Sequence, residues 1–217
     1  MQPASGVRKK LADANAVPRA PAVLLIDEHE LFLSALKRLL TSKPLNASVA
    51  LSTRSSEAVA IVRSSLIDVV VCDVQAKPVP GTDLSAILST GPHAVPVILL
   101  TEDEDGPLLA AFVLSPAAGL FRKDTPVEEF LEGIAEVLRG GHAVGRTMLQ
   151  PVLDRLTPPE RKVVFLVGRR QSDRAIAASL GLSQESVRDH LAQACRKLGL
   201  QSRAEAGRWA VKVGLAQ

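Results

Sequence analysis

The chain has 217 residues, with 26 Lys and Arg against 23 Asp and Glu, and this length suits one large domain or two small ones. No apolar run of about 18 residues and no signal-peptide pattern occurs, so we expect a cytoplasmic protein rather than a membrane-spanning or secreted one. Cys72 and Cys195 both lie in apolar segments, where we expect them to be core residues, and they form neither a disulfide framework nor a zinc-ligand spacing.

Charge is unevenly distributed along the chain. Residues 21–153 hold 10 Lys and Arg against 16 Asp and Glu, whereas residues 154–217 hold 12 against 6. A basic segment behind an acidic one indicates a nucleic-acid partner for the carboxyl-terminal part alone. Residues 1–20 contain Arg8, Lys9 and Lys10 without a sustained period, and we expect a disordered basic arm there.

Apolar strands alternate with amphipathic helices from Ala22 onward. The expected strands are 23–26, 49–51, 69–72, 95–100 and 119–122. The expected helices are 31–40, 56–63, 83–88, 107–114 and 127–139. Five such repeats with continuously apolar strands predict an α/β domain, a doubly wound five-stranded parallel sheet covered by helices on both faces. We place this domain at residues 21–140 and a linker at residues 141–153.

Polar residues stand where the predicted strands end. They are Asp27, Glu28, Asp73, Thr101 and Lys123. Ligands of such sheets bind beyond the carboxyl ends of the strands, so these side chains should converge. Three close carboxylates repel one another and tolerate each other best around a hard cation, which predicts a Mg²⁺ site at Asp27, Glu28 and Asp73. Asp73 is then suited to form an acyl phosphate, with Thr101 and Lys123 binding the phosphoryl oxygens.

Residues 154–217 predict a small all-α domain. Ser172 and Ser183 are good helix N-caps, and Gly181 and Gly199 are good helix ends. A short helix, a glycine turn and a longer helix with one apolar face are typical of a helix-turn-helix, whose second helix reads a major groove. We expect base contacts from Arg188 and Asp189. The full set of candidate DNA contacts is Ser172, Gln184, Arg188, Asp189, Gln193, Arg196, Lys197 and Arg203.

Two family resemblances follow from these motifs. The chain from Leu156-Thr157-Pro158-Pro159-Glu160 to Ser202-Arg203-Ala204-Glu205-Ala206 resembles the LuxR-type helix-turn-helix over essentially its whole length. The order and placement of the strand-end residues resemble the receiver domain of bacterial response regulators, which has a CheY- or flavodoxin-like fold. From about residue 22 the whole chain therefore resembles a bacterial two-component response regulator of the LuxR-type (NarL/FixJ) class.

The resemblance implies a transcription regulator, a switch rather than a turnover enzyme. It implies that a sensor histidine kinase phosphorylates Asp73 and that Thr101 and Phe121 are the pair that moves on phosphorylation. It also implies a homodimer on a two-fold double-stranded DNA operator, with no membrane partner. In the unphosphorylated state we expect the receiver to mask the reading helix. We expect Trp209 to pack in the core of the small domain, on a helix that is also a candidate dimer contact.

The sequence departs from the family pattern near the predicted phosphate site. Pro80-Gly81 follows Asp73 about three residues later than is usual, which predicts a reshaped loop. Glu102 stands where the family has a small residue, and Asp103, Glu104 and Asp105 add further negative charge. In the small domain, Ala192 stands where the family often has a basic residue, and the family often has a glycine near the position of Arg170.

These departures leave two alternatives open. One is a receiver that takes no phosphate and serves as a dimerisation or ligand-sensing module beside the DNA-binding domain. The more distant alternative is a phosphohydrolase with Asp73 as its aspartyl nucleophile. A basic helix-turn-helix has no use in such an enzyme, which argues against this alternative.

Overall fold

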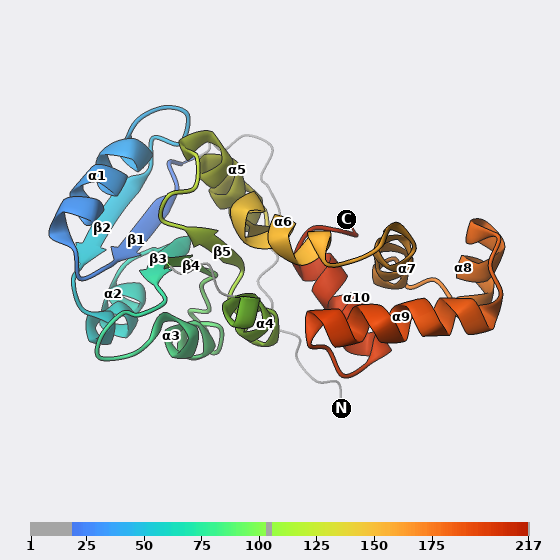
Figure 1. Cartoon of the computed structure of the whole chain (residues 1–217). Helices are drawn as coiled ribbons and strands as arrows, with labels where there is room; N and C mark the ends of the chain where they lie inside the picture. Colours follow the sequence, from blue (N-terminus) through green and yellow to red (C-terminus); the bar gives the residue numbers. More distant parts are fainter. Residues whose placement is uncertain (1–18, 103–105, 217) are drawn as a thin grey trace.

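The computed structural model describes residues 19–102 and 106–216. Asp103, Glu104, Asp105 and nearly all of the predicted basic arm lie outside the described residues. The described strands form a parallel sheet in the order β2-β1-β3-β4-β5-β6 (Figure 1). Their bounds are β1 Ala22–Ile26, β2 Ser48–Ser52, β3 Val69–Asp73, β4 Val97–Thr101, β5 Gly119–Arg122 and β6 Ala143–Val144. The predicted α/β architecture is confirmed, with a sixth strand added at one edge.

Helices cover both faces of the sheet. They are α1 Glu30–Thr41, α2 Ala58–Ser64, α3 Gly81–Leu88, α4 Gly106–Leu114 and α5 Val127–Leu138, and a short 3₁₀ turn, Ser55–Glu57, precedes α2. Successive side chains of a strand point to opposite faces of the sheet. Each continuously apolar strand therefore contributes side chains to the hydrophobic core on each face. Val23 and Leu25 pack with α1 and α5, whereas Leu24 and Ile26 pack with α2, α3 and α4 (Figure 1).

The segment predicted as a linker is partly structured. Its first residues form β6, which pairs in parallel with β5, and Arg146–Asp154 form α6. The N–H groups of Ala143 and Gly145 donate to the carbonyl oxygens of Ala118 and Leu120, at 3.0 and 2.9 Å. A two-residue strand is too short to leave a period in the sequence, which explains why the five-strand prediction missed it.

The carboxyl-terminal helices are α7 Pro158–Gly168, α8 Asp173–Leu180, α9 Gln184–Leu198 and α10 Arg203–Lys212. Ser172 and Ser183 cap α8 and α9 as predicted, and Gly181 and Gly199 end them with φ of 67° and 68°. Only glycine adopts this left-handed conformation without steric cost, so the two glycines fix the turns. Trp209 is 1% exposed, which confirms that it is a core residue.

The cysteines are also buried as predicted, and both are free thiols. Burial raises the pKa of the Cys72 thiol to about 12. None of the helices in the described ranges combines the length and hydropathy needed to cross a lipid bilayer.

Candidate functional site

The carboxyl edge of the sheet brings four predicted site residues together. Asp27 follows β1, Asp73 ends β3, Thr101 ends β4 and Lys123 follows β5. Asp27 and Thr101 are each 2% exposed, and Asp73 is 9% exposed. Polar groups that are this deeply buried need partners, because an unpaired carboxylate away from water is strongly destabilising.

Lys123 is the common partner of the two aspartates. Its Nζ lies 2.6 Å from Asp73 Oδ2 and 2.8 Å from Asp27 Oδ2. Burial opposes the ammonium charge, but the hydrogen bonds with Asp27 and Asp73 outweigh it and raise the pKa of Lys123 far above its ordinary value. One ammonium therefore balances two buried carboxylates, and the group keeps an excess negative charge.

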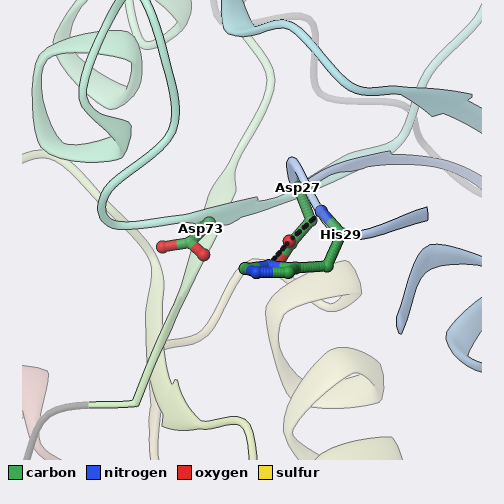
Figure 2. A group of neighbouring side chains, drawn as sticks. All are labelled: Asp27, His29 and Asp73. Atoms are coloured by element: carbon green, nitrogen blue, oxygen red, sulfur yellow. Dashed lines mark hydrogen bonds and ion pairs between the residues drawn. The ribbon is translucent and has the colours of Figure 1, made fainter. Parts of the chain in front are cut away.

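Asp27 is held on its other oxygen by His29. Oδ1 accepts a hydrogen bond from the His29 backbone N–H at 2.8 Å and lies 2.9 Å from His29 Nδ1 (Figure 2). Burial alone would raise the pKa of Asp27, but the hydrogen bonds from Lys123 and His29 lower it below the ordinary value. Asp27 is therefore a carboxylate at neutral pH.

The residues positioned to hold a cation differ from the predicted set. Ligand atoms of Asp27, His29 and Asp73 all lie within 4.8 Å of one another (Figure 2). Glu28 is not in this group, because its side chain is 49% exposed and pairs with Lys77, with Glu28 Oε2 at 3.1 Å from Lys77 Nζ. His29 was not predicted, since a histidine just after a strand is ordinary in a surface loop and carries no distinctive spacing.

The long loop after Asp73 still closes against this residue. Asp73 Oδ1 accepts a hydrogen bond from the Gln75 N–H at 2.7 Å, and the Gly81 N–H donates to the Val74 carbonyl oxygen at 2.9 Å. A Cβ atom on Gly81 would lie 2.5 Å from the Asp73 carbonyl oxygen, so the start of α3 approaches too closely for any side chain. The late position of Pro80-Gly81 therefore lengthens the loop without moving its end away from Asp73.

The predicted switch pair occupies neighbouring strands. Thr101 and Phe121 are 2% and 1% exposed, and Phe121 pairs in register with Leu100. The Phe121 ring meets that of Phe130 edge to face, with centroids 5.4 Å apart. Its tip lies over Gly133 of α5, where a Cβ atom would be 2.1 Å from Phe121 Cζ. The ring is therefore fixed in an inward position by a gap that only glycine leaves.

Glu102 adds its negative charge at the outer edge of the site, beside Lys123. Its side chain is 72% exposed, and Oε1 lies 3.4 Å from Lys123 Nζ. The carboxylate thus touches the outer side of the ammonium that serves Asp27 and Asp73. A phosphoryl group that approaches Lys123 would compete with this exposed and weakly held contact.

The predicted reading helix α9 presents its polar face to solvent. Val187, Leu191, Ala194, Cys195 and Leu198 are buried against the domain, as the apolar period predicted. The exposed candidate contacts are Gln184, Arg188, Asp189, Gln193 and Arg196, together with Ser172 at the start of α8. The expectation that the receiver masks this helix is wrong for this structure, because the helix that packs against the receiver is α10.

Two of the candidate DNA contacts, Lys197 and Arg203, are bound to other residues of the domain. Lys197 Nζ lies 2.7 and 2.9 Å from the two carboxylate oxygens of Glu160, which is 1% exposed. Arg203 binds Asp173 and the Gln171 carbonyl oxygen, both at 2.5 Å. Their contact with DNA phosphates remains a prediction. In the structure both residues form ion pairs between helices, Lys197 with Glu160 and Arg203 with Asp173.

In the ion pair of Lys197 with Glu160, the loss of Lys197 would leave a buried carboxylate without its charged partner. Its carboxylate also closes a capping box with Thr157 at the start of α7. Because Lys197 is 36% exposed, we expect Lys197→Met to lower the free energy of unfolding of this domain by about 2 kcal/mol, less than for a fully buried pair. Urea unfolding measures this loss, and Arg196→Met on the exposed face is the control. Equal stabilities of the two variants would contradict the expectation.

The two departures in the small domain both lie on its surface. Ala192 and Arg170 are exposed, and Arg170 has a φ of 59°, in the left-handed region where glycine is favoured. An L-residue in this region costs about 1 kcal/mol. The backbone of Arg170 is therefore strained, and its exposed side chain adds a positive charge just after the end of α7.

Comparisons with known proteins match both halves of the chain. The family model described as response regulator receiver domain matches residues 23–135, and that of bacterial regulatory proteins, luxR family, matches residues 154–210. The transcriptional regulatory protein MctR of Rhizobium johnstonii is 26% identical over 201 residues, 89% of this chain and 94% of MctR. The nitrate/nitrite response regulator protein NarP of Escherichia coli is 27% identical over 197 residues, 85% of this chain and 91% of NarP.

Solved structures share the fold. The structure of the two-component response regulator RcsB–DNA complex has a TM-score of 0.56 at 18% identity, covering 90% of this chain and 100% of that chain. A LuxR-family response regulator from Aurantimonas has a TM-score of 0.58 at 20% identity, covering 63% of this chain and 98% of that chain.

Proposed function

Because the chain belongs to the bacterial response regulators that join a receiver domain to a LuxR-family DNA-binding domain, we propose that it regulates transcription and that phosphorylation of Asp73 controls it. The observation that carries this proposal is the contact of Lys123 with both Asp27 and Asp73 at the carboxyl edge of the sheet. We assign the receiver to residues 21–140, the connection to residues 141–153 and the DNA-binding domain to residues 154–217.

The proposed transfer uses Asp73 as the nucleophile. A carboxylate oxygen of Asp73 attacks the phosphorus of a phosphohistidine in a sensor kinase, the P–N bond breaks, and the released imidazole takes up a proton. Lys123, already 2.6 Å from Asp73 Oδ2, neutralises charge on the phosphoryl oxygens. We assign to the hydroxyl of Thr101, at the end of the adjacent strand, the binding of one of these oxygens. Each receiver takes one phosphoryl group rather than turning over a substrate.

A divalent cation fits the donor set of this site. Asp27 and Asp73 carry one more negative charge than Lys123 balances, and buried like charges of this kind are stabilised by a bound cation. We propose Mg²⁺ held by Asp27 and Asp73, with His29 beside them, in place of the predicted ligand Glu28. Bound there, the cation would supply positive charge that offsets the repulsion between the Asp73 carboxylate and an incoming phosphoryl group.

DNA binding is assigned to the exposed face of α9. Arg188 and Asp189 are the proposed base contacts, and Arg196 is a proposed phosphate contact. A two-fold operator bound by a homodimer agrees with a single reading helix in each chain. The exposed position of this face supports the assignment, because its polar side chains are accessible to solvent rather than buried against the receiver.

Intact-mass analysis after incubation with acetyl phosphate tests the proposal. We expect an adduct of one phosphoryl group that requires Mg²⁺ and is absent from Asp73→Asn. Without an adduct, intact DNA binding would support the phosphorylation-independent receiver. Sustained hydrolysis of small phosphate esters would instead support the aspartyl-nucleophile phosphohydrolase.

A further inference from the structure

A cleft lies where the DNA-binding domain meets the receiver. Its volume is about 800 Å³, within the range of roughly 300–1,000 Å³ that is typical of small-molecule sites. The receiver lines this interdomain cleft with Val113 of α4 and with His142, just before β6. The DNA-binding domain lines it with the end of α7 and with one face of α10, which lies beside α4 (Figure 1). Both domains therefore contribute to one cavity.

Positive charge without a carboxylate partner is concentrated in the interdomain cleft. Its titratable lining is entirely basic, namely His142, Arg170, Arg203, Arg208 and Lys212. Arg203 is paired with Asp173 at 2.5 Å. Within residues 19–102 and 106–216, by contrast, Arg170, Arg208 and Lys212 form no ion pair. Cations that share a cleft repel one another, so an anion bound among them would be strongly attracted.

Lys212 supplies a fixed positive charge to the cleft. Its Nζ donates hydrogen bonds to the carbonyl oxygens of Phe112, at 2.6 Å, and Ser115, and it lies 4.3 Å from the centroid of the Phe112 ring. These neutral partners hold the ammonium in place without cancelling its charge. Burial lowers the pKa of Lys212 to about 8, so the amine still carries its proton at neutral pH.

Two exposed arginines surround the same space. Arg208 lies one turn before Lys212 on α10, and Arg170 follows α7. A guanidinium group presents its N–H donors in a plane that matches pairs of phosphate oxygens. The left-handed backbone of Arg170, with a φ of 59°, is a strained conformation of the kind that clusters at ligand-binding sites. Two guanidinium groups beside one ammonium suit a ligand with several charged oxygens, such as a diphosphate.

The rest of the lining is apolar or small. Val113, Val167 and Val211 provide apolar surface, and Val211 is 44% exposed. Ala204 and Gly207 lie on one face of α10, where their small size lets a flat ring approach the helix backbone closely. Apolar walls with a few convergent polar groups are the usual composition of a small-molecule site. A ligand with both a flat ring and a polyanionic group would use both parts of this lining.

We propose that the interdomain cleft binds a nucleoside diphosphate, with its phosphates on Arg170, Arg208 and Lys212 and its base on the apolar surface beside α10. The proposal is independent of phosphorylation, because the cleft contains none of the residues at the carboxyl edge of the sheet. It also leaves the reading helix available, since no residue of α9 lines the cleft. A DNA phosphate offers the same oxygens as a diphosphate, so the experiment must separate these two sources.

Isothermal titration calorimetry with ADP tests the site in the full-length protein. EDTA is present, so that no divalent cation links the nucleotide to Asp27 and Asp73. We expect one ADP to bind per chain and pyrophosphate to bind more weakly, because pyrophosphate lacks the ring that contacts the apolar surface. Adenosine should show no measurable binding, because it lacks the charge that the cations attract.

Arg170→Asn and Arg208→Gln each remove one cation from the cleft. Asparagine tolerates the left-handed backbone at position 170, so the turn after α7 should persist. Each variant should weaken ADP binding by about tenfold or more, as expected for the loss of a charge-assisted hydrogen bond. Arg196→Gln, on the exposed face of α9 outside the cleft, is the matched control and should leave ADP binding unchanged. Cooperative unfolding and circular dichroism establish that the variants are folded.

Several results would overturn the nucleotide site. One is the absence of saturable ADP binding to the wild type, and another is equal ADP affinity in the wild type, Arg170→Asn and Arg208→Gln. An equal loss in Arg196→Gln would show general attraction to cations instead of a site. Fluorescence anisotropy with a labelled random-sequence duplex tests the other source of phosphate. Weaker DNA binding by the two cleft variants, without ADP binding to the wild type, would assign the arginines to DNA phosphates and refute the site.

The outcome for Asp73 is separate. Asp73→Asn should bind ADP as the wild type does, because Asp73 is outside the cleft. ADP binding without an acetyl phosphate adduct on Asp73 would support the cleft and refute the phosphorylation proposal. An adduct on Asp73 without ADP binding would refute the cleft and leave the phosphorylation proposal intact.

Discussion

Lys123→Met is expected to lower the free energy of unfolding of the receiver domain by about 3 kcal/mol at pH 7, because removing one partner leaves a buried carboxylate uncompensated. Asp27 is 2% exposed and has its Oδ2 directed to Lys123. The same substitution should slow formation of the Asp73 adduct by about 100-fold or more, since it removes a positioned charge from the developing phosphoryl oxygens. Urea unfolding and intact-mass time courses measure the two effects.

The stability loss should depend on pH with a defined sign. In the wild type the pKa of Asp27 is lowered from 3.8, so its stabilising contribution is present above that value and is lost as the pH falls through the folded-state pKa. Without Lys123 the two carboxylates face each other, which raises the pKa of the pair in the folded state. Protonation then relieves the repulsion, and the difference between variant and wild type should shrink from pH 7 to pH 5.

A surface ion pair provides the control for this experiment. Lys77 is 73% exposed and pairs with Glu28 at 3.1 Å, so Lys77→Met should cost less than about 1 kcal/mol. Mg²⁺ should recover part of the stability of Lys123→Met by replacing the missing positive charge. A pH-independent loss, or a similar loss in Lys77→Met, would show that charge compensation by Lys123 is not what holds this edge of the sheet.

Gly133→Ala is expected to destabilise the receiver by about 1–3 kcal/mol through overpacking. The new Cβ atom would lie 2.1 Å from Phe121 Cζ, in a position that two atoms cannot share, so the ring must leave its inward site. Gly207→Ala is the contrasting substitution, also at a glycine within a helix. A Cβ atom on Gly207 would come no closer than 3.5 Å to the Val167 carbonyl oxygen. We expect that variant to gain roughly 0.5–1 kcal/mol from helix propensity.

A double mutant identifies the cause of the Gly133 effect. Phe121→Leu removes the ring tip that the new methyl group would strike, so the combined cost of both substitutions should be smaller than the sum of the single costs. Thermal or urea unfolding of the four proteins completes this cycle. Additive costs would mean that Gly133 serves helix geometry rather than the packing of Phe121.

Local patterns explain why much of the fold could be predicted from the sequence. Each apolar strand lies between helical segments, and the caps at Ser172 and Ser183 need only neighbouring residues to be identified. The convergence of Asp27, Asp73 and Lys123 followed from the parallel topology, because such strands end at one edge. The helix caps and this cluster are thus consequences of short-range sequence and a general topological rule.

The remaining features depend on directions and distances that no local pattern encodes. Glu28 and His29 are adjacent in sequence, yet the backbone turn after β1 directs one outward to Lys77 and the other toward Asp27. Lys197 was predicted only as a DNA contact, because its ion pair with Glu160 depends on the packing of α7 against α9. Lys212 and Phe112 are 100 residues apart, so their contact depends on the relative placement of two domains.

The pairing of β6 with β5 fixes where the connection between the two domains leaves the sheet. The Gly145 N–H still donates to the Leu120 carbonyl oxygen, and α6, which begins at Arg146, packs against β5 and α4. A connection held in this way keeps the two domains at a high effective concentration near each other. A Cβ atom on Gly145 would lie 3.2 Å from Phe121 Cδ1, which places the start of the connection against the ring predicted to move on phosphorylation.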